Sequence, residues 1–109
     1  VRFKIPVGVA YGSDLRLVEQ LLLEVAAENP DVLRDPAPVV RLMRFGDSAV
    51  EFELRVWSTT LVHKRGKLIS DLNFAIYEKF QQHGIEIPFP QREVRIRGVA
   101  SDSAMRSSE

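Results

Sequence analysis

The segment VEFELRVW, residues 50–57, carries the clearest structural signal in this chain. Its side chains alternate with a period of two, and the apolar set is Val50, Phe52, Leu54 and Val56. Because successive side chains of a strand point to opposite faces, the segment predicts a strand with one buried face and one largely solvated face, where Glu51, Glu53, Arg55 and Trp57 lie. A parallel sheet covered on both faces is therefore excluded.

Two more strands are predicted on the N-terminal side of this segment. Residues 3–11 alternate in the same way, and the apolar set is Phe3, Ile5, Val7, Val9 and Tyr11. Residues 39–45 follow a loop with three prolines, and residues 46–48 (Gly-Asp-Ser) form a short turn into the strand at 50–57. The two segments around this turn are expected to pair.

A first helix is predicted between these two strands. Apolar residues recur at spacings of three and four, at Leu15, Val18, Leu21, Leu22 and Val25. Ser13 and Asp14 supply an N-cap, since a short side-chain oxygen can accept from the first amides of a helix. The helix should end near Asn29, because Pro30 disfavours a helical residue before it.

A second helix is predicted after a ragged start over residues 61–68, where Gly66 and several basic residues suit a first turn poorly. Its apolar residues repeat every four positions, at Leu68, Leu72, Ile76 and Phe80. Gly84 suits the left-handed position after a helix, and Ile85 suits the hydrophobic contact of a Schellman motif.

The remaining chain divides into three predicted parts. Residues 85–91 have extended character, and Pro88 with Pro90 restricts them to an edge strand. Residues 92–97 form one more short strand, and the small polar residues 100–109 form a disordered tail. The order of elements predicts an α+β, ferredoxin-like split βαβ domain over 1–91, with two helices on one face of an antiparallel sheet and the first and third strands central.

The composition narrows the possible functions. The 15 Lys and Arg residues balance the 15 Asp and Glu residues, so no overall basic field favours nucleic acid as a partner. The chain has no Cys, which removes disulfides, thiolate nucleophiles and Cys-based zinc sites. Its apolar runs are far shorter than the 18 or more residues of a membrane span, which predicts a soluble piece. Because it begins at Val1, we expect a fragment or a processed product.

Three segments of the sequence resemble the soluble C-terminal domain of the small-conductance mechanosensitive channel (MscS) family. They are VGVAYGSD at 7–14, RVWS at 55–58 and GIEIPFPQ at 84–91. The last of these, after an amphipathic helix, is the rarest pattern. Taken with their order and spacing, the three segments extend the resemblance over nearly all of residues 1–99.

The resemblance implies both a function and an assembly. Such channels are homo-oligomers of identical subunits, typically heptamers, in the bacterial inner membrane, and they release solutes on osmotic downshift. Their cytoplasmic parts form a hollow cage to which each subunit contributes a domain like this one. Attachment to the membrane is then expected through N-terminal segments absent from this sequence. The resemblance also implies that residues 92–99 form a strand that assembles with neighbouring subunits.

Four residues are candidates for a subunit interface. Trp57 is expected on the solvated strand face, where it contacts another subunit or packs under a loop. Phe89 lies in a proline-stiffened segment that either docks on a neighbour or forms a plain edge strand with its apolar side chains in the core. Val94 and Ile96 give the assembly strand one apolar face.

No catalytic, cofactor or metal site is predicted. His63 and His83 lie near opposite ends of one helix, too far apart to share a metal, and Ser13 with Asp14 is explained by capping. An RNA-binding domain of this fold would need stacking aromatics and basic residues where Glu51 and Glu53 stand. An acylphosphatase-type enzyme would need an anion-binding loop at residues 11–14, where Asp14 places a carboxylate. A ligand-sensing regulatory module of ferredoxin-like fold stays open as the alternative.

Overall fold

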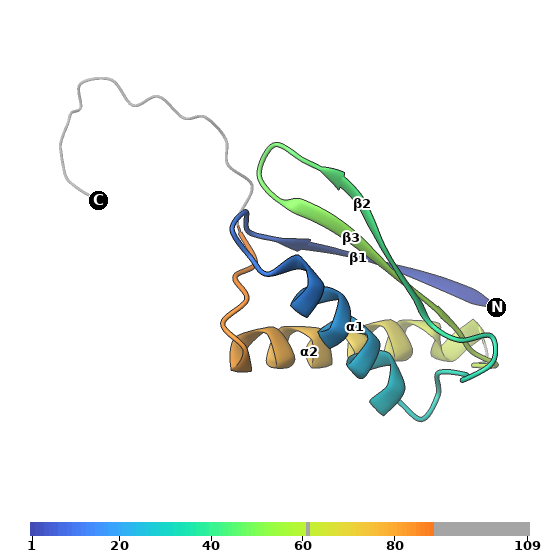
Figure 1. The fold of residues 1–109 in the computed structure, drawn as a ribbon. Helices are drawn as coiled ribbons and strands as arrows, with labels where there is room; N and C mark the ends of the chain where they lie inside the picture. The colour runs from blue at the N-terminus through green and yellow to red at the C-terminus, as the bar shows by residue number, and fades with distance from the viewer. Residues whose placement is uncertain (61, 89–109) are drawn as a thin grey trace, which may run out of the picture.

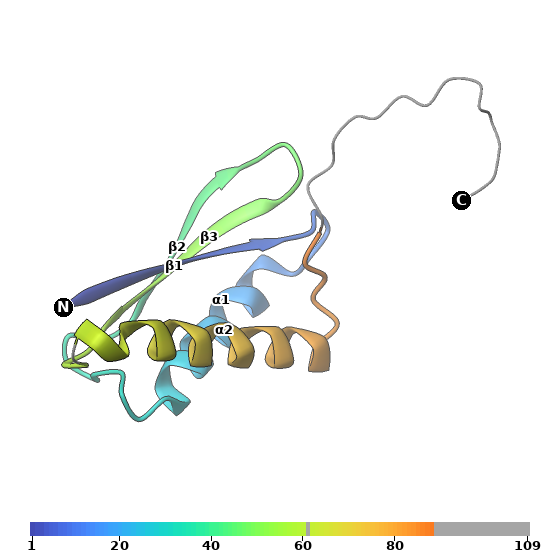
Figure 2. The ribbon, with the colours of Figure 1, turned by 180° about the vertical axis from the view of Figure 1, so that it is seen from behind.

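The computed structural model describes residues 1–60 and 62–88. Along the chain the elements are β1 (Arg2–Val9), α1 (Leu15–Glu28), β2 (Val39–Phe45), β3 (Val50–Trp57), the 3-10 turn η1 (Val62–Lys64) and α2 (Arg65–Gln82). Figure 1 shows both helices on one face of the sheet, and the view from behind in Figure 2 shows the same two layers. The predicted α+β architecture is confirmed.

The sheet has the order β1-β3-β2, and β3 pairs antiparallel with both neighbours. The β1–β3 register runs without interruption from Arg2 opposite Trp57 to Val9 opposite Val50. One further pair extends it, because the Ser58 N–H donates to the Val1 carbonyl (3.1 Å) and the Val1 amino group donates to the Ser58 carbonyl (3.3 Å). The central place of β3 matches the prediction.

The predicted fourth strand is wrong for the part of it that the structure describes, since residues 85–88 form no strand. They are linked to β1 through the Ala10 N–H, which donates to the Glu86 carbonyl at 2.9 Å. Pro88 has no N–H to contribute to a ladder, which limits pairing here. Within the described residues β1 is therefore an edge strand. Residues 89–91 of the predicted strand, the predicted assembly strand at 92–99 and the predicted tail at 100–109 lie outside the described residues.

The core lies between the sheet and the helices. The inward side of β3 is buried as expected, at Val50, Phe52, Leu54 and Val56. The predicted stripe of α2 faces it, with Leu68, Leu72, Ile76 and Phe80 all buried. β1 adds Phe3, Ile5, Val7 and Val9, whereas Tyr11 lies beyond the end of the strand and is exposed. Each fully buried side chain of this size contributes about 1.5–3 kcal/mol relative to an exposed one.

The helix ends follow the capping chemistry predicted from the sequence. The Leu17 N–H donates to Asp14 Oδ1 (3.2 Å), which makes Asp14 the N-cap of α1. α2 begins without a side-chain cap at Lys64, in agreement with its ragged start. At its end Gly84 has φ of +70°, and the Ile85 N–H donates to the Phe80 carbonyl (2.9 Å), as in a Schellman motif. Ile85 is buried in the core, so the contact predicted for it is confirmed.

Candidate subunit interface

The face of the sheet opposite the helices carries two ion pairs among the described residues. Arg44 donates to both carboxylate oxygens of Glu51, from Nε at 2.9 Å and from Nη2 at 3.2 Å. The hydrogen bond from Arg44 holds the pKa of Glu51 below its usual range, because it stabilises the carboxylate. Arg55 Nε donates to Glu53 Oε1 at 2.7 Å, and both side chains are largely shielded from solvent. This face therefore combines two ion pairs with the exposed basic side chains of Arg2 and Lys4.

Trp57 lies at the end of this face and is half-buried, not fully exposed. Its backbone carbonyl accepts from the Leu33 N–H (2.8 Å), which ties the end of β3 to the loop after α1. The next residue, Ser58, is buried, and its Oγ donates to the Asp31 carbonyl at 2.6 Å. Trp57 therefore stands beside a well-connected loop, and its role at an interface stays a prediction. The other three predicted interface residues, Phe89, Val94 and Ile96, lie outside the described residues.

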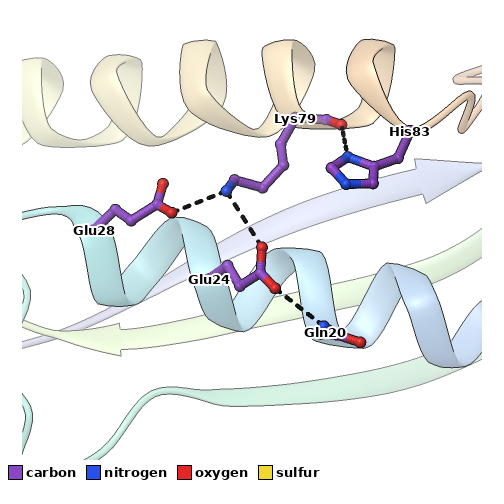
Figure 3. A network of polar contacts seen from close by, with 5 residues as sticks. All are labelled: Gln20, Glu24, Glu28, Lys79 and His83. Atoms are coloured by element: carbon purple, nitrogen blue, oxygen red, sulfur yellow. Dashed lines mark hydrogen bonds and ion pairs between the residues drawn. The ribbon is translucent and has the colours of Figure 1, made fainter.

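The two helices are joined by a lysine from α2 that reaches two carboxylates of α1. Lys79 Nζ donates to Glu28 Oε2 at 3.0 Å and to Glu24 Oε1 at 3.3 Å, and Gln20 donates to the other oxygen of Glu24 (Figure 3). Hydrogen bonds from Gln20 and from Lys79 hold the pKa of Glu24 below its usual value. The bond to Glu28, and then the one to Glu24, raises the pKa of Lys79. The network fixes which flank of α2 faces α1.

The opposite flank of α2 carries exposed aromatic side chains that the sequence reasoning missed. Phe74 is 68% exposed and Tyr77 is 55% exposed. With Gly66, Ile69, Ser70 and Asn73 they line an open hollow of about 500 Å³. We call these six residues the α2 flank. Both aromatics lie off the stripe that repeats every four residues, and that departure is the signal that could have identified them.

A second apolar surface lies along β2, beyond its buried residue Val40. Leu42 is 41% exposed and Phe45 is 67% exposed, and Met43 between them is also exposed. The register of β2 on β3 shifts between Leu42 and Arg44, so Met43 occupies a β-bulge. Apolar residues on both sides of the bulge break the period of two, which is why the sequence alone did not identify this surface.

The β2 surface continues into a notch beside α1. The notch has a volume of about 400 Å³, and its apolar lining consists of Leu15, Val40, Leu42 and Phe52. Its charged lining consists of Arg16, Glu19 and Arg41. We call these seven residues the α1–β2 notch. In Figure 1 the turn between β2 and β3 rises away from both helices, so this end of β2 extends beyond the part of the sheet that they cover.

Neither histidine belongs to a possible metal site in the described part of the chain. No group of three or more His, Cys, Asp and Glu side chains that could hold a metal ion is found among residues 1–60 and 62–88. His83 caps the end of α2, with Nδ1 2.9 Å from the Lys79 carbonyl oxygen (Figure 3). In the same residues no helix is both long enough and apolar enough to cross a bilayer.

The family model described as "Mechanosensitive ion channel MscS, C-terminal" matches residues 3–87. This chain belongs to the MscS family. The family is one of channels, not of enzymes, and the resemblance to it is confirmed by a match that includes segments 7–14 and 55–58 and residues 84–87 of the third segment. The match does not favour the ligand-sensing alternative.

Relatives of the MscS family agree with this assignment. An "Uncharacterized MscS family protein" of Haemophilus influenzae is 48% identical over 96 residues, which are 88% of this chain and 9% of that protein. The "Mechanosensitive channel MscK" of Escherichia coli is 38% identical over 101 residues, which are 93% of this chain and 9% of that protein. The present chain thus spans about a tenth of these relatives' lengths.

The fold also matches a solved member of the MscS family. The crystal structure of Helicobacter pylori MscS in its closed state has a TM-score of 0.76 and 26% identity, and the match covers 90% of this chain and 38% of that chain. Channels of this family are homo-oligomers.

Proposed function

We propose that this domain is part of an oligomeric cage on the cytoplasmic side of the bacterial inner membrane, below a pore that releases solutes on osmotic downshift. The observation that carries the proposal is the family match over residues 3–87, together with the fold shared with a solved channel. The partners are identical subunits, seven in the complete channel. The pore belongs to membrane segments outside this sequence, and the domain contributes assembly without catalysis.

Residues 92–99 act as an assembly strand in this proposal. The described chain reaches Pro88 without adding a fourth strand to the sheet, and its buried core is built from the sheet and the two helices. An unpaired strand leaves backbone donors and acceptors that another subunit can satisfy. Val94 and Ile96 give such a strand one apolar face, and Phe89 and Trp57 are proposed as further contacts between subunits.

A truncation in the full-length channel tests the proposal. Ending the chain after Gln91 should lower the oligomer fraction, measured by size in detergent, and should reduce survival after osmotic downshift. The melting temperature of the 109-residue domain truncated at the same place should change little, because the core built by the described residues is left intact. A truncated channel that assembles and protects cells as well as the intact one would contradict the role of residues 92–99.

Amide exchange in the isolated domain gives a second test. Val94 and Ile96 should exchange much faster than Phe52 and Leu54, which lie in the central strand. Equal protection in a monomeric sample would show that residues 92–97 belong to the domain's own sheet, and the assembly role would then be lost.

A further inference from the structure

The α2 flank and the α1–β2 notch lie on opposite sides of the domain. Lys79 Nζ faces α1, and Tyr77, two residues earlier, lies about 200° around the helix from Lys79. Phe74 lies about 140° around it, so both aromatics point away from α1. The notch is formed by α1 and β2. Figure 1 views the domain from the side of α1 and β2, and Figure 2 views it from the side of α2 and β1.

Both surfaces are hollowed and partly apolar, and they differ in how far their aromatic side chains are exposed. The α2 flank presents two aromatic side chains that are more than half exposed. The notch is a recess of about 400 Å³ with an apolar lining, a size within the range of pockets that hold compact ligand groups. The exposed Phe74 and Tyr77 of one copy can enter the recess of another only if the two copies meet with unlike faces.

The charges around the two surfaces are also complementary. Beside Phe74, Lys67 is paired with Asp71 (2.7 Å), and Glu78 adds a negative charge with no ion-pair partner among the described residues. At the notch, Arg16 is paired with Glu19 (3.1 Å). Arg41 adds a positive charge there, and within residues 1–60 and 62–88 its guanidinium donates to the Val40 carbonyl and to no carboxylate. Glu78 and Arg41 are thus charges of opposite sign, and neither has an ion-pair partner among the described residues.

We propose that the α2 flank of one subunit seats in the α1–β2 notch of the next subunit, with Phe74 and Tyr77 in the recess and Glu78 near Arg41. The occupant is a second copy of this chain, so the inference rests on the proposed function and adds the contact between neighbours. A contact between unlike surfaces on opposite sides of a subunit is heterologous, and its repetition closes a ring when the rotation allows. A two-fold dimer would instead bring identical surfaces together.

Cysteine cross-linking in the full-length channel, in a background without other cysteines, tests the contact. The pair Tyr77→Cys and Leu42→Cys, carried together on each subunit, should give a ladder of products larger than dimers with a short thiol-reactive linker. Each single variant should give no product above background, because like positions do not meet. The matched control pairs Tyr77→Cys with Leu23→Cys, which has an exposure similar to that of Leu42 but lies outside the notch.

The outcomes separate this inference from the proposed function. An assembled oligomer that cross-links in neither double variant, or dimers formed by Tyr77→Cys alone, would overturn the heterologous contact and leave the cage role standing. Absence of any oligomer in the intact channel would overturn both.

Charge reversal gives an independent arm that leaves the aromatic side chains in place. Glu78→Arg and Arg41→Glu should each weaken association roughly two- to fivefold, the range expected for an exposed ion pair. The double variant should recover most of the loss, measured as the concentration at which the oligomer dissociates. Two independent losses with no recovery would contradict the proposed meeting of Glu78 and Arg41.

Discussion

β1 and β2 pair with the same central strand, yet they differ in how deeply their apolar side chains are buried. β1 keeps a regular register along its whole length and buries every second residue. β2 buries Val40, then bulges at Met43 and exposes its remaining apolar residues. Exposed apolar side chains such as Leu42 and Phe45 add little to the burial that stabilises the domain's own core. The difference separates a strand whose whole length serves the core from one whose far half is exposed, and this half includes Leu42 of the proposed contact between subunits.

The largest expected effect comes from one substitution made in both strands. Phe3→Ala in β1 should lower the free energy of unfolding by about 3–5 kcal/mol, because a 2% exposed aromatic leaves a cavity. Phe45→Ala in β2 should change it by about 0.5 kcal/mol or less, since that side chain is already exposed. Urea unfolding of the 109-residue domain measures both. Similar losses at the two positions would mean that β2 is part of the core after all.

A smaller effect is expected at the turn that leads from α2 back to the end of β1. Gly84→Ala should cost about 1 kcal/mol, because Gly84 has φ of +70° and a Cβ disfavours that conformation. Gly66→Ala is the control, because its backbone is helical and its added Cβ meets no atom within 4 Å. That change should be neutral or stabilise the helix by about 0.5–1 kcal/mol. If thermal unfolding shows equal effects at the two glycines, the turn does not hold residues 85–88 beside β1.

The smallest effect concerns the link between the helices that support both strands. Lys79→Met removes the bonds to Glu24 and Glu28, and the loss of stability should depend on pH. The pKa of Glu24 is lowered in the folded state. Its contribution to the free energy of unfolding is therefore fully present above pH 4.5, the ordinary pKa, and is lost as the pH falls through the folded-state pKa. The pKa of Lys79 is raised in the folded state. Its contribution to the free energy of unfolding is therefore fully present below pH 10.5, the ordinary pKa, and is lost as the pH rises through the folded-state pKa.

The difference between the wild-type domain and Lys79→Met should therefore be largest between these limits and should shrink outside them. Lys67→Met is a matched control, because Lys67 pairs with Asp71 within the same helix and does not join α2 to α1. A pH-independent difference, measured from melting temperatures across the range, would show that Lys79 acts through its aliphatic part and not through its charge.

The sequence predicts the parts of the fold that depend on contacts within one chain. The period of two at residues 50–57 and the period of four at Leu68, Leu72, Ile76 and Phe80 both report burial against the same core, so they identify the layers. Capping by Asp14 and the turn at Gly84 depend on a few neighbouring residues and were predicted for the same reason.

The surfaces could not be predicted in the same way. Phe74 and Tyr77 lie off the apolar stripe of α2, because nothing within the described chain packs over them. Leu42 and Phe45 lie on either side of a β-bulge that no local sequence pattern predicts. A side chain that meets another molecule is subject to that molecule's shape, which a single sequence does not contain. The fourth strand was predicted from the extended character of residues 85–91 and from the order of elements, and in the structure the Glu86 carbonyl instead accepts from the N–H of Ala10, just after β1.

The pair formed by Val1 and Ser58 gives the first strand a mechanical property. A force applied at Val1 along the axis of β1 runs parallel to the ladder, so it loads the bonds from Val1–Ser58 to Val9–Val50 together, in shear. A force at the turn between β2 and β3, directed across the sheet, would open bonds one after another. We therefore expect a higher rupture force when single domains are stretched between Val1 and residue 88 than when they are stretched between Gly46 and residue 88. Tension applied at Val1 would then move the domain as a rigid body before the domain unfolds.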